Sequence, residues 1–150
     1  MDDDDAAANR LIEHLKLEPH PEGGHYRQTW AGPDVDGRPS GTAILFLLRR
    51  GERSHWHRID ADEIWLFHAG TPLILGIEVG GVAADHALGP DPMAGQSPQV
   101  LVPAGRWQTA HAPGGWALVS CTVVPGFTFD GFELAPEDFD LPRGGPEQAA

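Results

Sequence analysis

The sequence contains one cysteine among its 150 residues. Cys121 has no partner for an internal disulfide, which argues against the stapled framework of small secreted domains. The longest apolar run, residues 43–48, is far too short to span a bilayer. Residues 2–5 are aspartates, whereas a signal peptide begins with a basic segment. We therefore expect a cytoplasmic protein with no membrane partner.

Positive charge is also scarce. There are 10 Lys+Arg against 22 Asp+Glu, which gives a formal net charge of −12. Duplex DNA and anionic membranes are bound through clustered Lys and Arg side chains, so nucleic acid is excluded as an expected partner. The four aspartates repel one another, and we expect residues 1–9 to form a disordered acidic tail.

Patterns long enough for a helix are rare, because 19 glycines and 14 prolines divide the chain into short stretches. Only residues 6–17 show apolar side chains at helical spacing. The short apolar stretches predict strands at residues 24–30, 42–49, 55–58, 64–68, 73–79, 99–102 and 117–124, with 127–132 as a further candidate. The sequence thus predicts one all-β domain over residues 10–141, a sandwich or small barrel with a short N-terminal helix, followed by a flexible tail over residues 142–150.

The densest concentration of reactive side chains lies in residues 51–70. Side chains two apart on a strand share a face, so His55 and His57 are expected to point the same way. A turn at residues 59–62 would bring Glu63 beside them on the returning strand. Two imidazoles and a carboxylate suit a divalent metal such as Zn, Fe, Mn or Ni. The alternative is a polar pocket in which these groups bond one another without metal.

This segment resembles the first motif of the cupins, in which Gly, His-x-His, Glu and Gly follow one another at set intervals. Glu63 and Gly70 have the expected six residues between them. The interval from His57 to Glu63 is longer than in the motif, and Asp62 fits the shorter interval, so both carboxylates remain candidates. The interval from Gly51 to the first histidine is shorter than expected.

The second cupin motif, Pro-x-Gly followed two residues later by His, is represented by residues 103–108. Gln108 stands at the position of the fourth metal ligand, and His111 follows three residues later as an alternative. The resemblance therefore implies His55, His57, Glu63 and Gln108 as the candidate metal ligands.

Five segments together resemble a family of small single-domain cupins, many of them of unknown function. They read HPEGGHYRQT (20–29), SxxHR (54–58), DEIW (62–65), VPAGRWQ (102–108) and PGF (125–127). The resemblance covers residues 11–139. It implies a double-stranded β-helix barrel, a homodimer, and a small-molecule ligand in the mouth of the barrel.

Three residues are expected to carry catalysis. His57 is the candidate general base, because imidazole titrates near neutral pH, and Glu63 is expected to orient it. Tyr26 is the candidate acid or base that a likeness to cupin-type sugar epimerases implies. The expected ligand contacts share polar or aromatic side chains within the motifs: Glu22, Arg58, Trp65, Trp107 and Gln108.

Two classes of function follow. The first is an isomerase or epimerase of a sugar-like or carbonyl-containing metabolite, with a metal-dependent oxygenase or lyase as its variant. The second is a non-catalytic small-molecule-binding cupin, a sensor or storage-like protein, which the missing fourth histidine supports.

Overall fold

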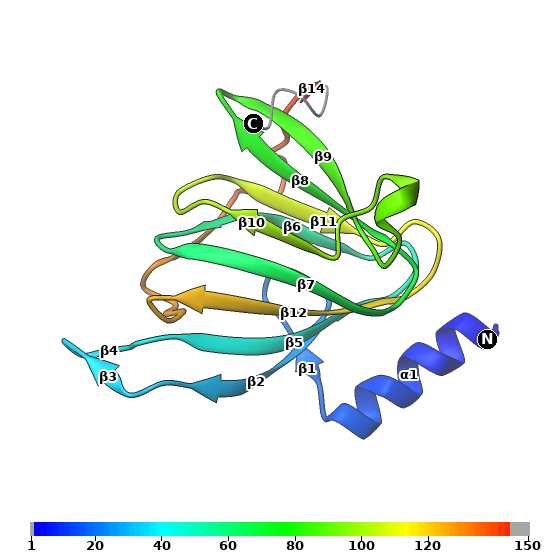
Figure 1. Cartoon of the computed structure of the whole chain (residues 1–150), viewed down its shortest axis with the longest axis horizontal. Helices are drawn as coiled ribbons and strands as arrows, with labels where there is room; N and C mark the ends of the chain where they lie inside the picture. The colour runs from blue at the N-terminus through cyan, green and yellow to red at the C-terminus, as the bar shows by residue number, and fades with distance from the viewer. Residues whose placement is uncertain (1, 145–150) are drawn as a thin grey trace.

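A computed structural model describes residues 2–144 as two facing six-stranded sheets preceded by one helix (Figure 1). The first sheet, in the order β1-β2-β5-β12-β7-β10, contains β1 (Glu18–Pro19), β2 (His25–Ala31), β5 (Thr42–Leu48), β7 (Asp62–Gly70), β10 (Gln99–Val102) and β12 (Ala117–Val124). The second sheet, in the order β13-β6-β11-β8-β9-β14, contains β6 (Arg53–Ile59), β8 (Leu73–Val79), β9 (Val82–Leu88), β11 (Gln108–His111), β13 (Phe132–Leu134) and β14 (Arg143–Gly144). A hairpin of β3 (Asp34–Val35) and β4 (Arg38–Pro39) and the 3-10 helix η1 (Pro92–Ala94) complete the described elements. The expected all-β fold with an N-terminal helix is confirmed.

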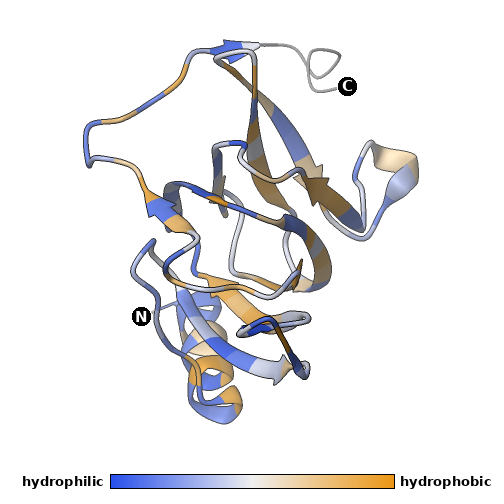
Figure 2. Cartoon of the chain, turned by 90° about the vertical axis from the view of Figure 1, so that its left-hand side faces the viewer, coloured by the Kyte–Doolittle hydropathy of each residue, from blue (hydrophilic) through white to orange (hydrophobic). Residues whose placement is uncertain are grey.

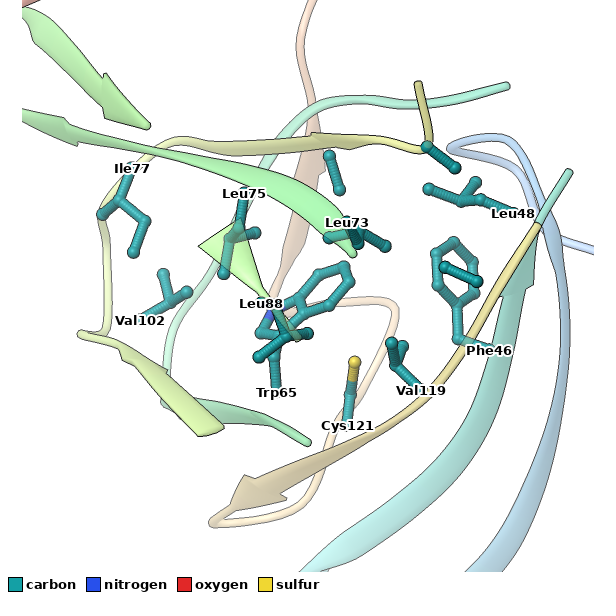
Figure 3. Close-up of a cluster of buried hydrophobic side chains, with 13 residues drawn as sticks. Phe46, Leu48, Trp65, Leu73, Leu75, Ile77, Leu88, Val102, Val119 and Cys121 are labelled. Atoms are coloured by element: carbon teal, nitrogen blue, oxygen red, sulfur yellow. The ribbon is translucent and has the colours of Figure 1, made fainter. Parts of the chain in front are cut away.

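The hydrophobic core lies between the two sheets. Hydropathy changes along several strands from one residue to the next (Figure 2), and in β12 alternate residues, including Val119, Cys121 and Val123, are buried. Figure 3 shows Phe46, Trp65 and their neighbours pointing toward one another from both sheets. This period of two places one face of each strand in the core.

Helix α1 (Asp3–Leu15) begins three residues before the helix that the sequence predicts. The side chain of Asp2 accepts a hydrogen bond from the backbone N–H of Asp5 at 2.8 Å and pairs with Arg50. Acidic side chains in a first turn also suit the positive end of the helix. The expectation of a disordered tail is therefore wrong for residues 2–9. No helix among residues 2–144 is long and apolar enough to cross a membrane.

Several strands were not predicted, or were predicted incompletely. The sequence analysis missed β9, which contains three alanines of low β-propensity, and the four-residue β11. Residues 127–132 form a turn segment that only reaches β13 at Phe132. Strand β14 lies in the predicted flexible tail and pairs with β9, so the prediction is wrong for residues 143–144. The rest of that tail, residues 145–150, lies outside the described residues.

Candidate active site

A cavity of about 260 Å³ opens between the sheets. Its walls come from β2, β5, β6, β7, β12, the turn before β2 and the segment before β13. The lining residues are His20, Glu22, Tyr26, Gln28, Thr42, Ile44, His57, Ile59, Glu63, Cys121, Val123, Phe127, Phe129 and Phe132. Buried titratable groups and aromatic rings thus share one small space.

Glu22 and His57 form a buried pair in this cavity. Oε2 of Glu22 lies 2.9 Å from Nδ1 of His57, and both side chains are less than a tenth exposed. The carboxylate reaches this position because the turn before β2 packs against β6. The backbone N–H of His55 donates to the carbonyl of Glu22 at 2.7 Å. At Gly23, which has φ +111°, a Cβ atom would lie only 2.2 Å from the carbonyl oxygen of Arg53. Only glycine permits this approach.

The pair is ionised. Burial by itself would lower the pKa of His57, but the carboxylate of Glu22, with a further contribution from Glu63, raises it to about 9. Burial would raise the pKa of Glu22, and the positive charge of His57 lowers it below its usual value. At neutral pH, His57 is therefore an imidazolium held by a carboxylate.

Glu63 ends a second chain of buried hydrogen bonds. Nε2 of Gln108 donates to Oε1 of Glu63 at 2.9 Å, and Nε1 of Trp65 donates to Oε1 of Gln108 at 2.9 Å. Burial, together with the negative charge of Glu22, raises the pKa of Glu63 to about 7, although His57 acts in the opposite direction. The thiol of Cys121 donates to the same carboxylate. Glu63 thus exchanges its proton near neutral pH.

His20 and Tyr26 stand beside the Glu22–His57 pair. Their rings meet edge to face with centroids 4.5 Å apart. Nδ1 of His20 accepts from the backbone N–H of Glu22 at 3.1 Å, and burial lowers the pKa of His20. A neutral imidazole and a phenol therefore border the ionised pair.

The structure separates His55 from His57, and the expectation that they share a face is wrong. Gln108 pairs with His57 and Ala110 with Ser54, so β6 contains one extra residue, a β-bulge. His55 points out of the cavity, where its Nε2 lies 2.9 Å from the carbonyl oxygen of Pro136.

Several other expected site residues also lie outside the cavity. The guanidinium of Arg58 stacks on Trp107, 4.4 Å from the ring centroid, and pairs with Glu133. Asp62 accepts from the backbone of Ala104, which leaves Glu63 as the carboxylate of the hairpin that reaches the cavity. Trp65 is buried in the core, and its indole N–H donates to Gln108, which in turn bonds Glu63. His111 does not line the cavity.

The aromatic part of the cavity was missed in the sequence analysis. Phe127, Phe129 and Phe132 pack edge to face, with ring centroids 5.0 to 6.1 Å apart. The sequence does contain a sign of this aromatic group, because three phenylalanines lie within the six residues 127–132. That segment was interpreted as a strand. His20 belonged to a motif but was not a site candidate.

The donor atoms do not fit a metal centre. Across residues 2–144, no three His, Cys, Asp or Glu side chains are arranged to hold a metal ion. Nδ1 of His57 faces Glu22, His55 lies outside the cavity, and both ends of the Gln108 amide are bonded. The expected ligand set of His55, His57, Glu63 and Gln108 is therefore not assembled.

Comparison with known proteins agrees with this architecture. The family model described as "Cupin superfamily (DUF985)" matches residues 9–135. Protein SO0799 from Shewanella oneidensis is 43% identical, with a TM-score of 0.81, over 85% of this chain and 84% of that chain. A hypothetical protein from Leishmania major is 32% identical, with a TM-score of 0.80, over 85% of this chain and 86% of that one.

A more distant likeness concerns the fold alone. Oxalate decarboxylase from Bacillus subtilis is 13% identical, with a TM-score of 0.61, over 77% of this chain and 29% of its own. No curated protein matches the chain. The family model covers most of the sequence, and the chain belongs to the cupin superfamily, in the family described as DUF985.

Proposed function

We propose that this protein moves a proton at the carbon next to a carbonyl group of a small metabolite, as an isomerase or epimerase that uses its own side chains. One observation carries the proposal: the cavity contains both a cationic His57 and a Glu63 whose pKa is about 7. Acid–base catalysts need a pKa near the working pH. Two titratable groups whose environments set their pKa values apart are typical of an acid–base pair.

The proposal reverses the roles that the sequence suggested. His57 is already protonated at neutral pH, so it is the acid and hydrogen-bond donor. Glu22 engages its Nδ1, which leaves the Nε2–H for the carbonyl oxygen of a substrate. Glu63 takes the proton from the carbon, the oxygen gains negative charge as an enolate, and the imidazolium stabilises that charge. In epimerisation a proton returns to the same carbon and the carbonyl re-forms. In isomerisation of a hydroxycarbonyl compound, His57 gives its Nε2 proton to the enolate oxygen and takes back the proton of the hydroxyl group on the adjacent carbon, while Glu63 returns its proton to the former carbonyl carbon.

Tyr26 supplies a second proton donor in the epimerase form of the proposal. Inverting a carbon centre places one acid–base group on each face of the substrate. Tyr26 belongs to the cavity wall on β2, whereas Glu63 comes from β7. The isomerase form needs only Glu63 and His57.

The structure gives less support to metal-assisted catalysis in the same cavity. Studies of oxalate decarboxylase from Bacillus subtilis describe Mn(II) centres, but that protein shares 13% identity with this chain. In this chain His55 lies outside the cavity and both ends of the Gln108 amide are bonded, so the four expected ligands do not come together.

Label exchange tests the proposal. The protein is incubated in deuterated water with small ketones, hydroxyaldehydes and keto acids, and label incorporation at carbon is followed by mass spectrometry. We expect incorporation by the unmodified protein and none by Glu63→Gln. The matched control Glu133→Gln, on the exposed side of β13, should retain exchange.

Non-catalytic binding is the second candidate. The polar groups of the site are already bonded to one another, as in Gln108 between Glu63 and Trp65, and such a network can hold a ligand without chemistry. Compounds that bind tightly but acquire no label would favour this function over the isomerase.

A further inference from the structure

The composition of the cavity narrows the class of substrate. Building on the proposed function, we infer that the cavity selects an uncharged carbonyl compound with an aromatic or branched apolar group, and that Phe129 at its edge is a specificity-determining residue.

Among the residues that the structure describes, the cavity has no cationic side chain except His57, whose charge Glu22 already balances. No lysine or arginine is among its lining residues in the described part of the chain. Arginines next to lining residues in the sequence or contacting the segment before β13 are engaged elsewhere: Arg27 donates to the carbonyl of Leu15, Arg38 pairs with Asp60, and Arg58 pairs with Glu133. Phosphate and carboxylate groups are recognised by guanidinium, ammonium or helix N-termini. Here an anion would meet the carboxylate of Glu22, with the one cationic side chain already paired to it.

Much of the remaining wall is apolar. Ile44 and Val123 contribute aliphatic surface, and the three phenylalanines at positions 127, 129 and 132 contribute rings. The ring of Phe132 also stacks on His57, with centroids 5.6 Å apart. A sugar carries a hydroxyl on each carbon. Against this apolar wall several of its hydroxyls would lack hydrogen bonds, and each unbonded hydroxyl would cost binding free energy. An apolar group on the substrate avoids that cost.

The size of the cavity limits the ligand. A volume of about 260 Å³ corresponds to roughly nine water molecules at about 30 Å³ each. It lies at or below the lower end of ordinary ligand pockets, which is roughly 300 Å³. A compound with one ring and a short carbonyl-bearing chain is therefore of suitable size.

Phe129 is the exposed member of the aromatic group. Its side chain is 58% exposed, whereas the two other phenylalanines are partly buried. The segment that carries it is anchored on both sides: the backbone N–H of Phe127 donates to Oγ1 of Thr42 at 2.9 Å, and that of Asp60 donates to the carbonyl of Gly131 at 3.1 Å. A ligand in the cavity would cover apolar surface of Phe129 that is otherwise in water, which favours apolar ligands.

Binding of three related compounds tests the inference. The first probe is 2-hydroxyacetophenone with its hydroxyl on the carbon next to the ketone (2-hydroxy-1-phenylethanone), which is neutral and aromatic. The second is dihydroxyacetone, which lacks the apolar group. The third is benzoylformate, which has a carboxylate in place of the hydroxymethyl group. Affinities are measured by NMR titration of the whole protein. We expect 2-hydroxyacetophenone to bind at least tenfold more tightly than the other two, and Phe129→Ala to weaken its binding by about tenfold. Phe129→Leu should retain most of the affinity.

Met93→Ala is the matched control, because Met93 is 95% exposed on η1 and does not line the cavity. It should bind all three compounds as the unmodified protein does. Equal affinity of Phe129→Ala and the unmodified protein would overturn the role of Phe129. Failure of 2-hydroxyacetophenone to bind, or tighter binding of benzoylformate or dihydroxyacetone, would overturn the substrate class.

The same samples separate this inference from the proposed function. Binding of 2-hydroxyacetophenone without label exchange in deuterated water contradicts the isomerase and supports the ligand class. Label exchange confined to dihydroxyacetone supports the isomerase and contradicts the ligand class; benzoylformate has no hydrogen next to its ketone and serves as a binding probe only.

Discussion

Nδ1 of His57 lies 2.9 Å from Oε2 of Glu22, and both side chains are buried. The two residues are far apart in the sequence and meet because the turn before β2 packs against β6. Their pairing keeps a positive charge inside the cavity, where burial alone would remove it. The chemistry of the site depends on this contact.

Removing the carboxylate of Glu22 should lower the pKa of His57. In Glu22→Gln the imidazole of His57 stays buried, but it loses the carboxylate that does most to raise its pKa. We therefore expect the pKa of His57 to fall from about 9 toward its ordinary value of 6.5 or below. NMR titration of the imidazole measures the shift. Glu18→Gln, at an exposed position on β1, is the control and should leave the pKa of His57 unchanged. A pKa still near 9 in Glu22→Gln would contradict the assigned cause.

The stability of the protein should fall as pH rises from about 6.5 to 9, above the interval in which the lowered pKa values of His20, His86 and His111 act in the opposite direction. The folded pKa values of Glu63, about 7, and His57, about 9, both exceed their ordinary values of 4.5 and 6.5. The folded state therefore binds more protons than the unfolded state in these intervals, and the free energy of unfolding decreases with pH. Over its own interval each group contributes a loss on the order of 3 kcal/mol, and the contribution of His57 falls between pH 6.5 and about 9. Urea unfolding at pH 6.5, 7 and 9 measures the trend, and maximum stability near pH 9 would refute it.

Glu63→Gln should increase stability at pH 8 while it removes the proposed activity. The amide resembles the protonated acid and has no buried charge, and its oxygen can still accept from Gln108. We expect a gain of about 2 kcal/mol in the free energy of unfolding at pH 8 and little change at pH 5. Urea denaturation at both pH values provides the comparison, with Glu133→Gln as the exposed control. A loss of stability at pH 8 would show that the ionised carboxylate is favourable in the fold.

Gln108→Leu should destabilise the fold by about 2 to 4 kcal/mol. Leucine is similar in size but leaves the indole N–H of Trp65 and the carboxyl group of Glu63 without their buried partner. Gln99→Leu, at an exposed position on β10, should change the free energy of unfolding by less than about 0.5 kcal/mol. Equal effects of the two substitutions in urea would mean that the buried amide is not required.

Divalent metals should leave the protein unchanged. A metal present at 100 times its dissociation constant would add about 2.7 kcal/mol to the free energy of unfolding. We expect no such gain with Zn²⁺, Mn²⁺, Ni²⁺ or Fe²⁺, because His57 is protonated at neutral pH, His55 lies outside the cavity and both ends of the Gln108 amide are bonded within the chain. Thermal unfolding with each metal and with a chelator measures this. A co-purified metal that is lost in both His57→Ala and Glu63→Gln would reverse the conclusion.

The predictions from the sequence were most accurate where a local pattern determines structure. The alternation of apolar residues in residues 117–124 predicts β12 with its observed bounds, because one face of that strand is buried along its length. The motif residues His57 and Glu63 line the cavity, and Gln108 bonds Glu63 from the neighbouring sheet. Strand β9 was not predicted because its alanines have low β-propensity. Its strand conformation is stabilised by pairing with β8.

By itself, the sequence determined the all-β architecture, the N-terminal helix and the polar residues Glu22, Tyr26, His57 and Glu63 of the cavity wall, since these follow from periodicity and motifs. Only the tertiary structure decided which groups face the cavity. The bulge that turns His55 away depends on how β6 pairs with β11, and the charge of His57 depends on a carboxylate delivered by another segment. Burial and long-range contacts set both orientation and pKa, and neither quantity is encoded in the spacing of neighbouring residues.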